Sequence, residues 1–436
     1  MKLTPEEQAV LDGAQGPTLQ KVIKTVVLYG EAFGAECLAP ITGMPHLVGS
    51  FGANTIQPYF DMLQELIDAG LKTQQPFTVD PRPAEYETLR PSFIQRAVFD
   101  LVVFGKQKPY EKQLRALGLK DSNAFTCACY LPEVGNIPQR GDLLAWSESS
   151  AVVYANSVLG ARTNRNSAGI DLMCDILGKA PVFGFLTDEG RKAAWLVEVK
   201  TSRQPNAQLL GSAIGLKVME DVPYITGLDA YLGRELNPTA EAYLKDMGAA
   251  TASNGAVGLY HVEGLTPEAA DSGRALLKEG YRTYTIDDAE LERVMASYPV
   301  LWKDLQARPH SVFIGCPHLS YQQLLNWAEA FQTALQQAGQ ARVGVPTYLF
   351  SAPDVRSELQ QKNPHIFARL QAQGINITTI CPLMYMNNPL CAKQPIVTNS
   401  NKLRTYSSAR FFLDADALQI AVRGSLPQGG SHGESL

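Results

Sequence analysis

The feature that most constrains the fold is a regular alternation of short apolar runs and longer amphipathic segments over residues 256–400. Short runs rich in β-branched side chains predict strands, and the stretches between them predict helices. Such alternation is typical of a doubly wound, mainly parallel sheet. The predicted elements, in chain order, are strands Val257–Val262 and Arg282–Ile286, a helix from Asp288, strand Ser311–Ile314, a helix from Ser320, strand Thr347–Phe350, a helix near His365 and strand Asn376–Ile380.

The 436 residues are enough for roughly three domains. The expected division is an N-terminal helical segment over 1–72, an α/β region over 73–255, an α/β domain over 256–426 and a disordered tail over 427–436. Helical spacing predicts helices over Leu19–Ala35, Tyr59–Leu71 and Ser149–Leu159, two more between Pro91 and Leu119, and a left-handed Gly160 that ends the third. Thr4, Pro5 and Glu7 predict a capped helix start.

Charge argues for a small-molecule ligand. Lys and Arg total 38 against 43 Asp and Glu, a net charge of −5, and no basic block marks a surface for nucleic acid or anionic lipid. No apolar stretch approaches the roughly 18 residues that a membrane helix needs. The first residues lack the pattern of a secretory signal, so we expect a cytoplasmic protein whose seven cysteines are reduced.

Three cysteines are candidate metal ligands. Cys316 and Cys381 each follow a predicted strand, and ligands of an open α/β sheet bind beyond the carboxyl ends of its strands. Cys127 adds a third thiol from a loop-rich stretch. Three thiolates on an iron–sulfur cluster would leave one iron open to substrate. The alternative interpretation is that these are ordinary buried cysteines, since free cysteine is among the most buried residue types.

Polar residues supply further candidates. The segment Glu148–Arg165 gathers hydroxyls, amides and guanidiniums, and an arginine suits bidentate recognition of a carboxylate. A Gly/Pro-rich segment near residues 40–52 would let a ligand approach the backbone. The substrate-binding candidates are His46, Ser50, Glu148, Ser150, Asn156, Arg162, Thr163 and His318, and the catalytic candidates are Ser149, Arg162 and Lys402. Each has a plain alternative as a capping, packing or solvated residue.

Several of these residues also carry a family resemblance. The chain resembles the large, catalytic subunit of aconitase X, a branch of the aconitase superfamily, over nearly its whole length. The similarity rests on Leu3-Thr4 with Glu6-Glu7, Thr126-Cys127 with Tyr130, the run Glu148–Asn164, Gly315-Cys316-Pro317-His318, Cys381-Pro382, and Thr398-Asn399-Ser400 with Lys402. Two positions depart from the family pattern: Cys129 replaces a proline, and Leu403-Arg404-Thr405 replaces an aromatic-Ala-His sequence before Tyr406.

The resemblance implies aconitase-like α/β domains around an iron–sulfur cluster held by Cys127, Cys316 and Cys381, and a separate small subunit with a swivelling domain. It also implies a hydro-lyase that dehydrates cis-3-hydroxy-L-proline to 1-pyrroline-2-carboxylate, with Arg162 clamping the substrate carboxylate. The base is either a serine of the small subunit, by analogy with aconitase, or, within this chain, Lys402 or Ser149. One alternative is dehydration of 5-phosphomevalonate, for which Arg162, Arg165 and Arg404 are the visible cations. Another is a cluster-dependent regulatory protein that binds nucleic acid, against which the net charge argues.

Overall fold

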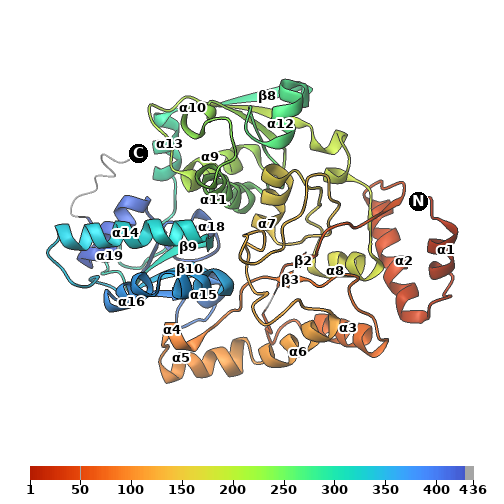
Figure 1. The fold of residues 1–436 in the computed structure, drawn as a ribbon, viewed down its shortest axis with the longest axis horizontal. Coiled ribbons are helices and arrows are strands. Elements are labelled where there is room, and N and C mark those ends of the chain that lie inside the picture. Colours follow the sequence, from red (N-terminus) through yellow and green to blue (C-terminus); the bar gives the residue numbers. More distant parts are fainter. Residues whose placement is uncertain (50, 428–436) are drawn as a thin grey trace.

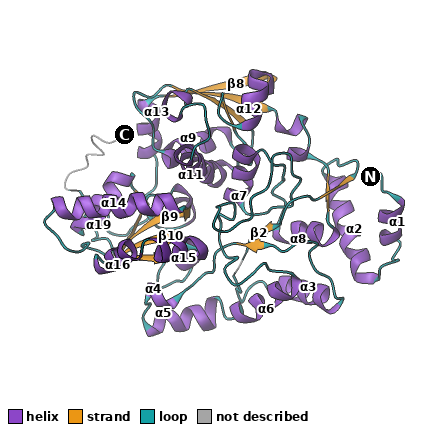
Figure 2. Ribbon diagram, in the orientation of Figure 1, coloured by secondary structure: helices purple, strands orange, loops and turns teal. Residues whose placement is uncertain are grey.

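The computed structural model describes residues 1–49 and 51–427. The expectations for Ser50 and, apart from Pro427, for the tail at 427–436 lie outside the described residues. Figure 1 shows α/β domains at one side of the molecule and the N-terminal helices at the other, and Figure 2 shows that long loops fill the region between them. No helix among the described residues has the length and apolarity that crossing a bilayer requires.

Residues 309–427 contain a parallel sheet with three of the five predicted strands, and the strands predicted over 257–262 and 282–286 belong to a separate sheet. The strand order of the sheet in 309–427 is β11-β10-β9-β12-β13, and every neighbouring pair is parallel. The direction of chain progression reverses between β9 and β12, which is where open α/β sheets bind ligands. The elements are β9 (Ser311–Leu319), α14 (Tyr321–Gln337), β10 (Thr347–Ser351), α15 (Pro353–Lys362), α16 (Pro364–Ala372), β11 (Ile375–Thr378), α17 (Pro382–Met386), β12 (Ile396–Thr398), α18 (Asn401–Tyr406), β13 (Arg410–Phe411) and α19 (Asp414–Arg423).

A second parallel sheet has the order β7-β6-β5-β8. It joins strands from both sides of residue 255, where the sequence predicted a domain boundary, because strand pairing links segments that are distant in the chain. The strand predicted over Val257–Val262 is only His261–Val262. The elements are β5 (Ala193–Val199), α9 (Ala207–Val218), β6 (Pro223–Thr226), α10 (Asp229–Leu232), α11 (Pro238–Gly255), β7 (His261–Val262), α12 (Pro267–Ser272), β8 (Leu277–Ile286) and α13 (Asp288–Ala296), with short 3-10 turns at η3 (Gly184–Leu186), η4 (Glu189–Arg191) and η5 (Gly273–Leu276).

The first 190 residues form helices around two small sheets, β1 with β4 and β2 with β3. The predicted helices are confirmed, and Thr4 and Glu7 form the predicted capping box. The elements are α1 (Pro5–Leu11), α2 (Pro17–Ala32), β1 (Leu38–Pro40), β2 (His46–Leu47), α3 (Gln57–Asp68), β3 (Thr78–Val79), α4 (Tyr86–Leu89), α5 (Phe93–Ala97), the π-helix η1 (Val98–Val103), α6 (Gln107–Leu117), α7 (Ser149–Tyr154), the π-helix η2 (Ala155–Leu159), α8 (Ala168–Leu177) and β4 (Lys179–Pro181). Gly160 ends η2 at a φ of 72°, as predicted.

Candidate active site

A cavity of about 290 Å³ brings Cys127, Cys316 and Cys381 together. The three lie 65 residues or more apart in the sequence. Cys316 lies in β9, Cys381 follows β11 and is the N-cap residue of α17, and Cys127 follows a β-bridge between Phe125 and Val79. The other lining residues are Val48, Phe51, Asp80, Pro81, Glu148, Ser149, Gly315, His318, Pro382, Leu383, Met384, Lys402 and Tyr406.

His318 connects the three cysteine segments. Its backbone N–H donates to the Cys127 sulfur at 3.4 Å, and its Nδ1 lies 3.0 Å from the hydroxyl of Thr126. Its Nε2 lies 3.2 Å from the carbonyl of Ile380, the residue before Cys381. Because a carbonyl only accepts, Nε2 carries the proton and Nδ1 accepts from Thr126. Both ring nitrogens are therefore engaged, and the side chain positions the thiols.

Burial holds the three thiols in the neutral form. Desolvation raises the pKa of Cys127, Cys316 and Cys381, the last to about 12. The Lys402 ammonium opposes this effect at all three positions. A thiolate is the form that binds metal, so a cation among the thiols favours ligation.

The thiols suit an iron–sulfur cluster. All three are free thiols and line one cavity. Iron–sulfur clusters are held by cysteine thiolates around several metal atoms. The donor set therefore fits the cluster that the family resemblance implies.

Glu148 and Lys402 form a buried ion pair beside the thiols. Lys402 Nζ lies 2.5 Å from Glu148 Oε1 and 3.2 Å from the hydroxyl of Ser149. The other Glu148 oxygen accepts from the Ser150 hydroxyl and caps α7 at the Ala151 N–H. Burial alone would raise the pKa of Glu148, but Lys402 outweighs it and holds that pKa at about 2. Burial likewise would lower the pKa of Lys402, but Glu148 and the nearby thiols raise it.

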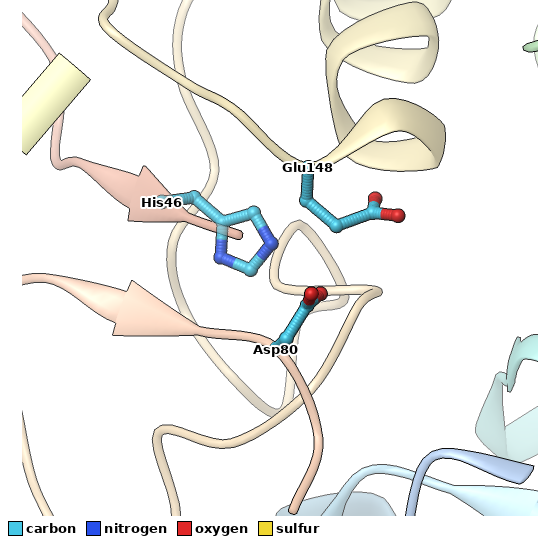
Figure 3. Close-up of side chains that lie close together, drawn as sticks. All are labelled: His46, Asp80 and Glu148. Carbon is cyan, nitrogen blue, oxygen red and sulfur yellow. The ribbon is translucent and has the colours of Figure 1, made fainter. Parts of the chain in front are cut away.

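Three hydrogen-bond acceptors converge beside the cavity: Asp80 and Glu148 line it, and His46 is buried directly behind them. Figure 3 shows the ring of His46 facing the carboxylates of Asp80 and Glu148, and one ligand atom of each lies within 4.8 Å of the others. His46 Nδ1 lies 2.9 Å from the hydroxyl oxygen of Thr78. That hydroxyl donates its own proton to the Pro45 carbonyl and accepts a hydrogen bond from the Asn136 side chain. Nδ1 therefore carries the proton, and the lone pair of Nε2 faces the carboxylates.

This cluster of acceptors is buried and incompletely bonded. His46 Nε2 has no hydrogen-bond partner within the part of the chain that the structure describes. Burial lowers the pKa of His46 to about 4, so the ring is neutral. Burial, and after it the charge of Glu148, raises the pKa of Asp80. The lone pair of His46 Nε2 faces the carboxyl groups of Asp80 and Glu148, and a hydrogen-bond donor or a cation bound between the three would satisfy them.

Five predicted site residues do not line the cavity: His46, Ser150, Asn156, Arg162 and Thr163. The Arg162 guanidinium donates to the Leu186 carbonyl at 3.2 Å and to Asp188 at 2.5 Å. Asn156 and Thr163 bond reciprocally, at 2.9 Å in each direction, and hold the turn after η2. Ser150 contacts the cavity only through Glu148 and Lys402. The clamp role of Arg162 therefore stays a prediction that this geometry does not support.

Asp80 and Gly315 line the cavity and were not among the predicted site residues. Asp80 follows strand β3 directly and precedes Pro81, so a polar residue at a strand end was the available signal. Gly315 has a φ of 101°, and a Cβ there would lie 2.6 Å from Leu319 Cγ and 2.9 Å from the Phe350 carbonyl oxygen. This conformation, which other residues rarely adopt, turns the chain immediately before Cys316.

Parallel α/β domains that bring three thiols and a lysine–carboxylate pair to one cavity define an aconitase-like class of enzyme. Family models agree: the aconitase X first domain matches residues 1–189, the second domain 193–296 and the third domain 309–416. The chain belongs to the aconitase X family. It aligns with the crystal structure of Thermococcus kodakaraensis aconitase X in its holo form with a TM-score of 0.79 and 29% identity, covering 97% of this chain and 100% of that one.

Curated relatives carry two activities. The phosphomevalonate dehydratase large subunit of Thermococcus kodakarensis is 35% identical over 76% of this chain and 77% of its own length. The cis-3-hydroxy-L-proline dehydratase of Pseudomonas aeruginosa is 28% identical over 98% of this chain and 71% of its own. Both names describe removal of water from a substrate. This protein is accordingly a dehydratase, a hydro-lyase of the aconitase X family.

Proposed function

We propose that the protein dehydrates cis-3-hydroxy-L-proline to 1-pyrroline-2-carboxylate. The observation that carries the proposal is the acceptor cluster of His46 Nε2, Asp80 and Glu148. The secondary ammonium of hydroxyproline brings one positive charge and two N–H donors, which match a buried lone pair beside two carboxyl groups. The acceptors would thus fix the ring nitrogen and, one bond away, the C2 carbon that loses its proton.

Proton transfers can be assigned to residues around that pose. Dehydration removes the C2 proton and breaks the C3–O bond, and the resulting enamine tautomerises to the imine. Asp80, whose pKa burial raises, is the proposed acceptor of the C2 proton. Lys402 holds a proton on Nζ and is the proposed donor to the departing hydroxide, with Ser149 orienting it. An iron–sulfur cluster held by Cys127, Cys316 and Cys381 would supply Lewis acidity for the hydroxyl.

Phosphomevalonate is the second candidate, because the relatives with that name reach 35% identity. Its phosphate and carboxylate are anionic, and it has no amine for the acceptor cluster. Among the described residues that line the cavity, Lys402 is the one Lys or Arg, and it is paired with Glu148. Binding a phosphate commonly requires several cationic or N–H donors, so the cavity charge favours the hydroxyproline substrate.

A small subunit is part of the proposal. Relatives from several archaea are named large subunits. The Pseudomonas relative matches this chain over 71% of its length, so more than a quarter of it lies outside the match. The large-subunit names support a small-subunit partner for this chain.

The test is product formation by the iron-loaded enzyme with its small subunit. We expect turnover of cis-3-hydroxy-L-proline, detected as 1-pyrroline-2-carboxylate by NMR, and none of 5-phosphomevalonate. His46→Gln should raise KM at least about tenfold because an ammonium acceptor is lost. Arg162→Lys is the control outside the cavity and should stay within about threefold of wild type. Turnover of phosphomevalonate alone would refute the proposed substrate.

A further inference from the structure

The second domain does not line the active-site cavity. It spans residues 193–296, and none of the described lining residues lies in that range. Its helix α11 nevertheless packs against β9 and α18, and its helix α9 packs against α18 (Figure 1). Strand β9 carries Cys316 and helix α18 carries Lys402. Any effect of this domain on the site must therefore pass through those two elements.

The thiol of Cys316 lies in an irregular part of β9. Paired residues join β9 to β10 up to Ile314 and again at Leu319, and they join β9 to β12 up to Phe313. We define the cysteine bulge as the intervening residues, 315–318. Because these residues have no paired strand residue within the described part of the chain, their buried backbone groups need side-chain partners.

The first such partner from the second domain is Gln208 of α9, which is 6% exposed. Its Nε2 donates to the Cys316 carbonyl at 3.3 Å, and the Ser400 hydroxyl donates to the same carbonyl at 2.5 Å. The Gln208 Oε1 accepts from the backbone N–H of Asn401, the first residue of α18, at 2.9 Å. One amide group therefore joins the thiol segment to the helix that carries Lys402.

The second partner is Lys245 of α11, which is 2% exposed. Its Nζ donates to the His318 carbonyl at 3.2 Å and pairs with Asp246 at 2.7 Å. The other Asp246 oxygen accepts from the Gln323 side chain of α14 at 2.9 Å. A buried ammonium must be paired and hydrogen-bonded, and the Lys245 ammonium takes one of its acceptors from the cysteine bulge.

We infer that Gln208 and Lys245 position the Cys316 thiol, so that the second domain sets the geometry of the cluster site without lining the cavity. The inference rests on the cluster of the proposed function and is independent of which substrate is dehydrated. One side chain binds the carbonyl of Cys316 and the other binds that of His318, so both ends of the thiol-bearing turn are fixed. Partners of this kind orient a ligand residue although they do not touch the metal.

The experiment measures alkylation of single thiols in the full, cluster-free chain. Iodoacetamide is added to wild type, Gln208→Met and Lys245→Met, and peptide mass spectrometry gives a rate for Cys316 and, as an internal reference, for Cys381. Gln373→Met is the matched control, because Gln373 is 8% exposed and donates to Gln332 at 2.8 Å outside the cavity. Circular dichroism melting confirms that each variant is folded. A second readout is the rate at which a chelator removes iron from the anaerobically reconstituted chain.

We expect Cys316 to react at least about tenfold faster in Gln208→Met and in Lys245→Met, because each variant removes a donor from a buried carbonyl and the bulge opens more often. Cys381 in these variants, and Cys316 in Gln373→Met, should stay within about twofold of wild type. Iron should leave both variants faster than it leaves wild type.

An unchanged Cys316 rate, or equal acceleration of Cys316 and Cys381, would overturn the inference. Neither readout uses a substrate, so turnover of phosphomevalonate refutes only the proposed substrate. A wild-type chain that takes up no iron, while its Cys316 rate still responds to the two variants, refutes only the proposed cluster.

Discussion

Replacement of Lys402 by methionine tests whether the Glu148 carboxylate depends on its cation. The pKa of Glu148 falls from 4.5 to about 2 in the folded protein. Each factor of ten in ionisation corresponds to about 1.4 kcal/mol, so its surroundings stabilise the charged form by about 3 kcal/mol. Removing one partner of a buried ion pair leaves an uncompensated charge and typically costs about 3–5 kcal/mol. We expect a loss in this range for Lys402→Met.

A double-mutant cycle with Glu148→Gln isolates the pair. Glutamine keeps an oxygen that can cap α7 at the Ala151 N–H but removes the charge. Each single variant leaves one buried charge unpaired, whereas the double variant leaves none. The double variant should therefore be at least about 2 kcal/mol more stable than the sum of the single losses implies.

The loss of stability in Lys402→Met should also depend on pH. Because the folded-state pKa of Glu148 is depressed, its stabilising contribution is present above about pH 4.5 and is lost as the pH falls toward 2. In Lys402→Met the strongest effect that opposes burial is lost and the Ser150 hydrogen bond remains, so we expect that pKa to rise and the variant to lose stability as the pH rises above 4.5. The gap between wild type and variant should be larger at pH 8 than at pH 5.

Native-state hydrogen exchange of α7 in the cluster-free protein measures these free energies locally, which suits a chain of several domains. The readout is the opening free energy of the amides in Ser149–Tyr154, measured at pH 5 and pH 8 with correction for the intrinsic exchange rate. Additive single losses, with a coupling below about 0.5 kcal/mol, would refute the reasoning. A gap that shrinks as the pH rises would refute the sign of the linkage.

Three further predictions concern other buried groups. Asp175 is buried, neither of its carboxylate oxygens has a hydrogen-bond partner among the described residues, and burial raises its pKa. Asp175→Asn should therefore raise Tm by a few degrees at pH 8 and hardly change it at pH 4. Equal changes in Tm at both pH values would contradict this prediction. Gly315→Ala should lose iron because its Cβ collides with Leu319, whereas Gly339→Ala, with open space around it, should retain iron in the same assay. Cys316→Ser should lose the visible absorbance and iron of the anaerobic protein, and Cys391→Ser, outside the cavity, should keep both.

Much of the local structure could be predicted because it depends on neighbours in the sequence. The capping box at Thr4 and Glu7 and the left-handed Gly160 each follow from side chains within one or two helical turns. Three strands of the five-stranded parallel sheet, β9, β10 and β11, followed from the period of their apolar residues, whereas β12 and β13 were not predicted. Cys316 was expected directly after a strand that ends at Ile314, and it lies instead within β9, three residues before that strand ends.

The extent of single elements was harder to predict. β9 extends to Leu319 rather than ending at Ile314, because the left-handed Gly315 lets the chain turn without leaving the sheet. The second sheet crosses the predicted boundary near residue 255, because the pairing partners of β5 and β6 lie beyond it. Strand register and partner choice depend on contacts that no local pattern records.

The sequence by itself determined which chemical groups this protein has: three candidate thiols, the run around Glu148, and Lys402. Only the tertiary structure decided which of them meet. It places Asp80 with His46 and Glu148, it binds Lys402 to a carboxylate 254 residues away, and it holds Arg162 against Asp188 outside the cavity. The physical reason is that a cavity forms where loops from separate domains pack together, and that packing depends on long-range burial rather than on sequence spacing.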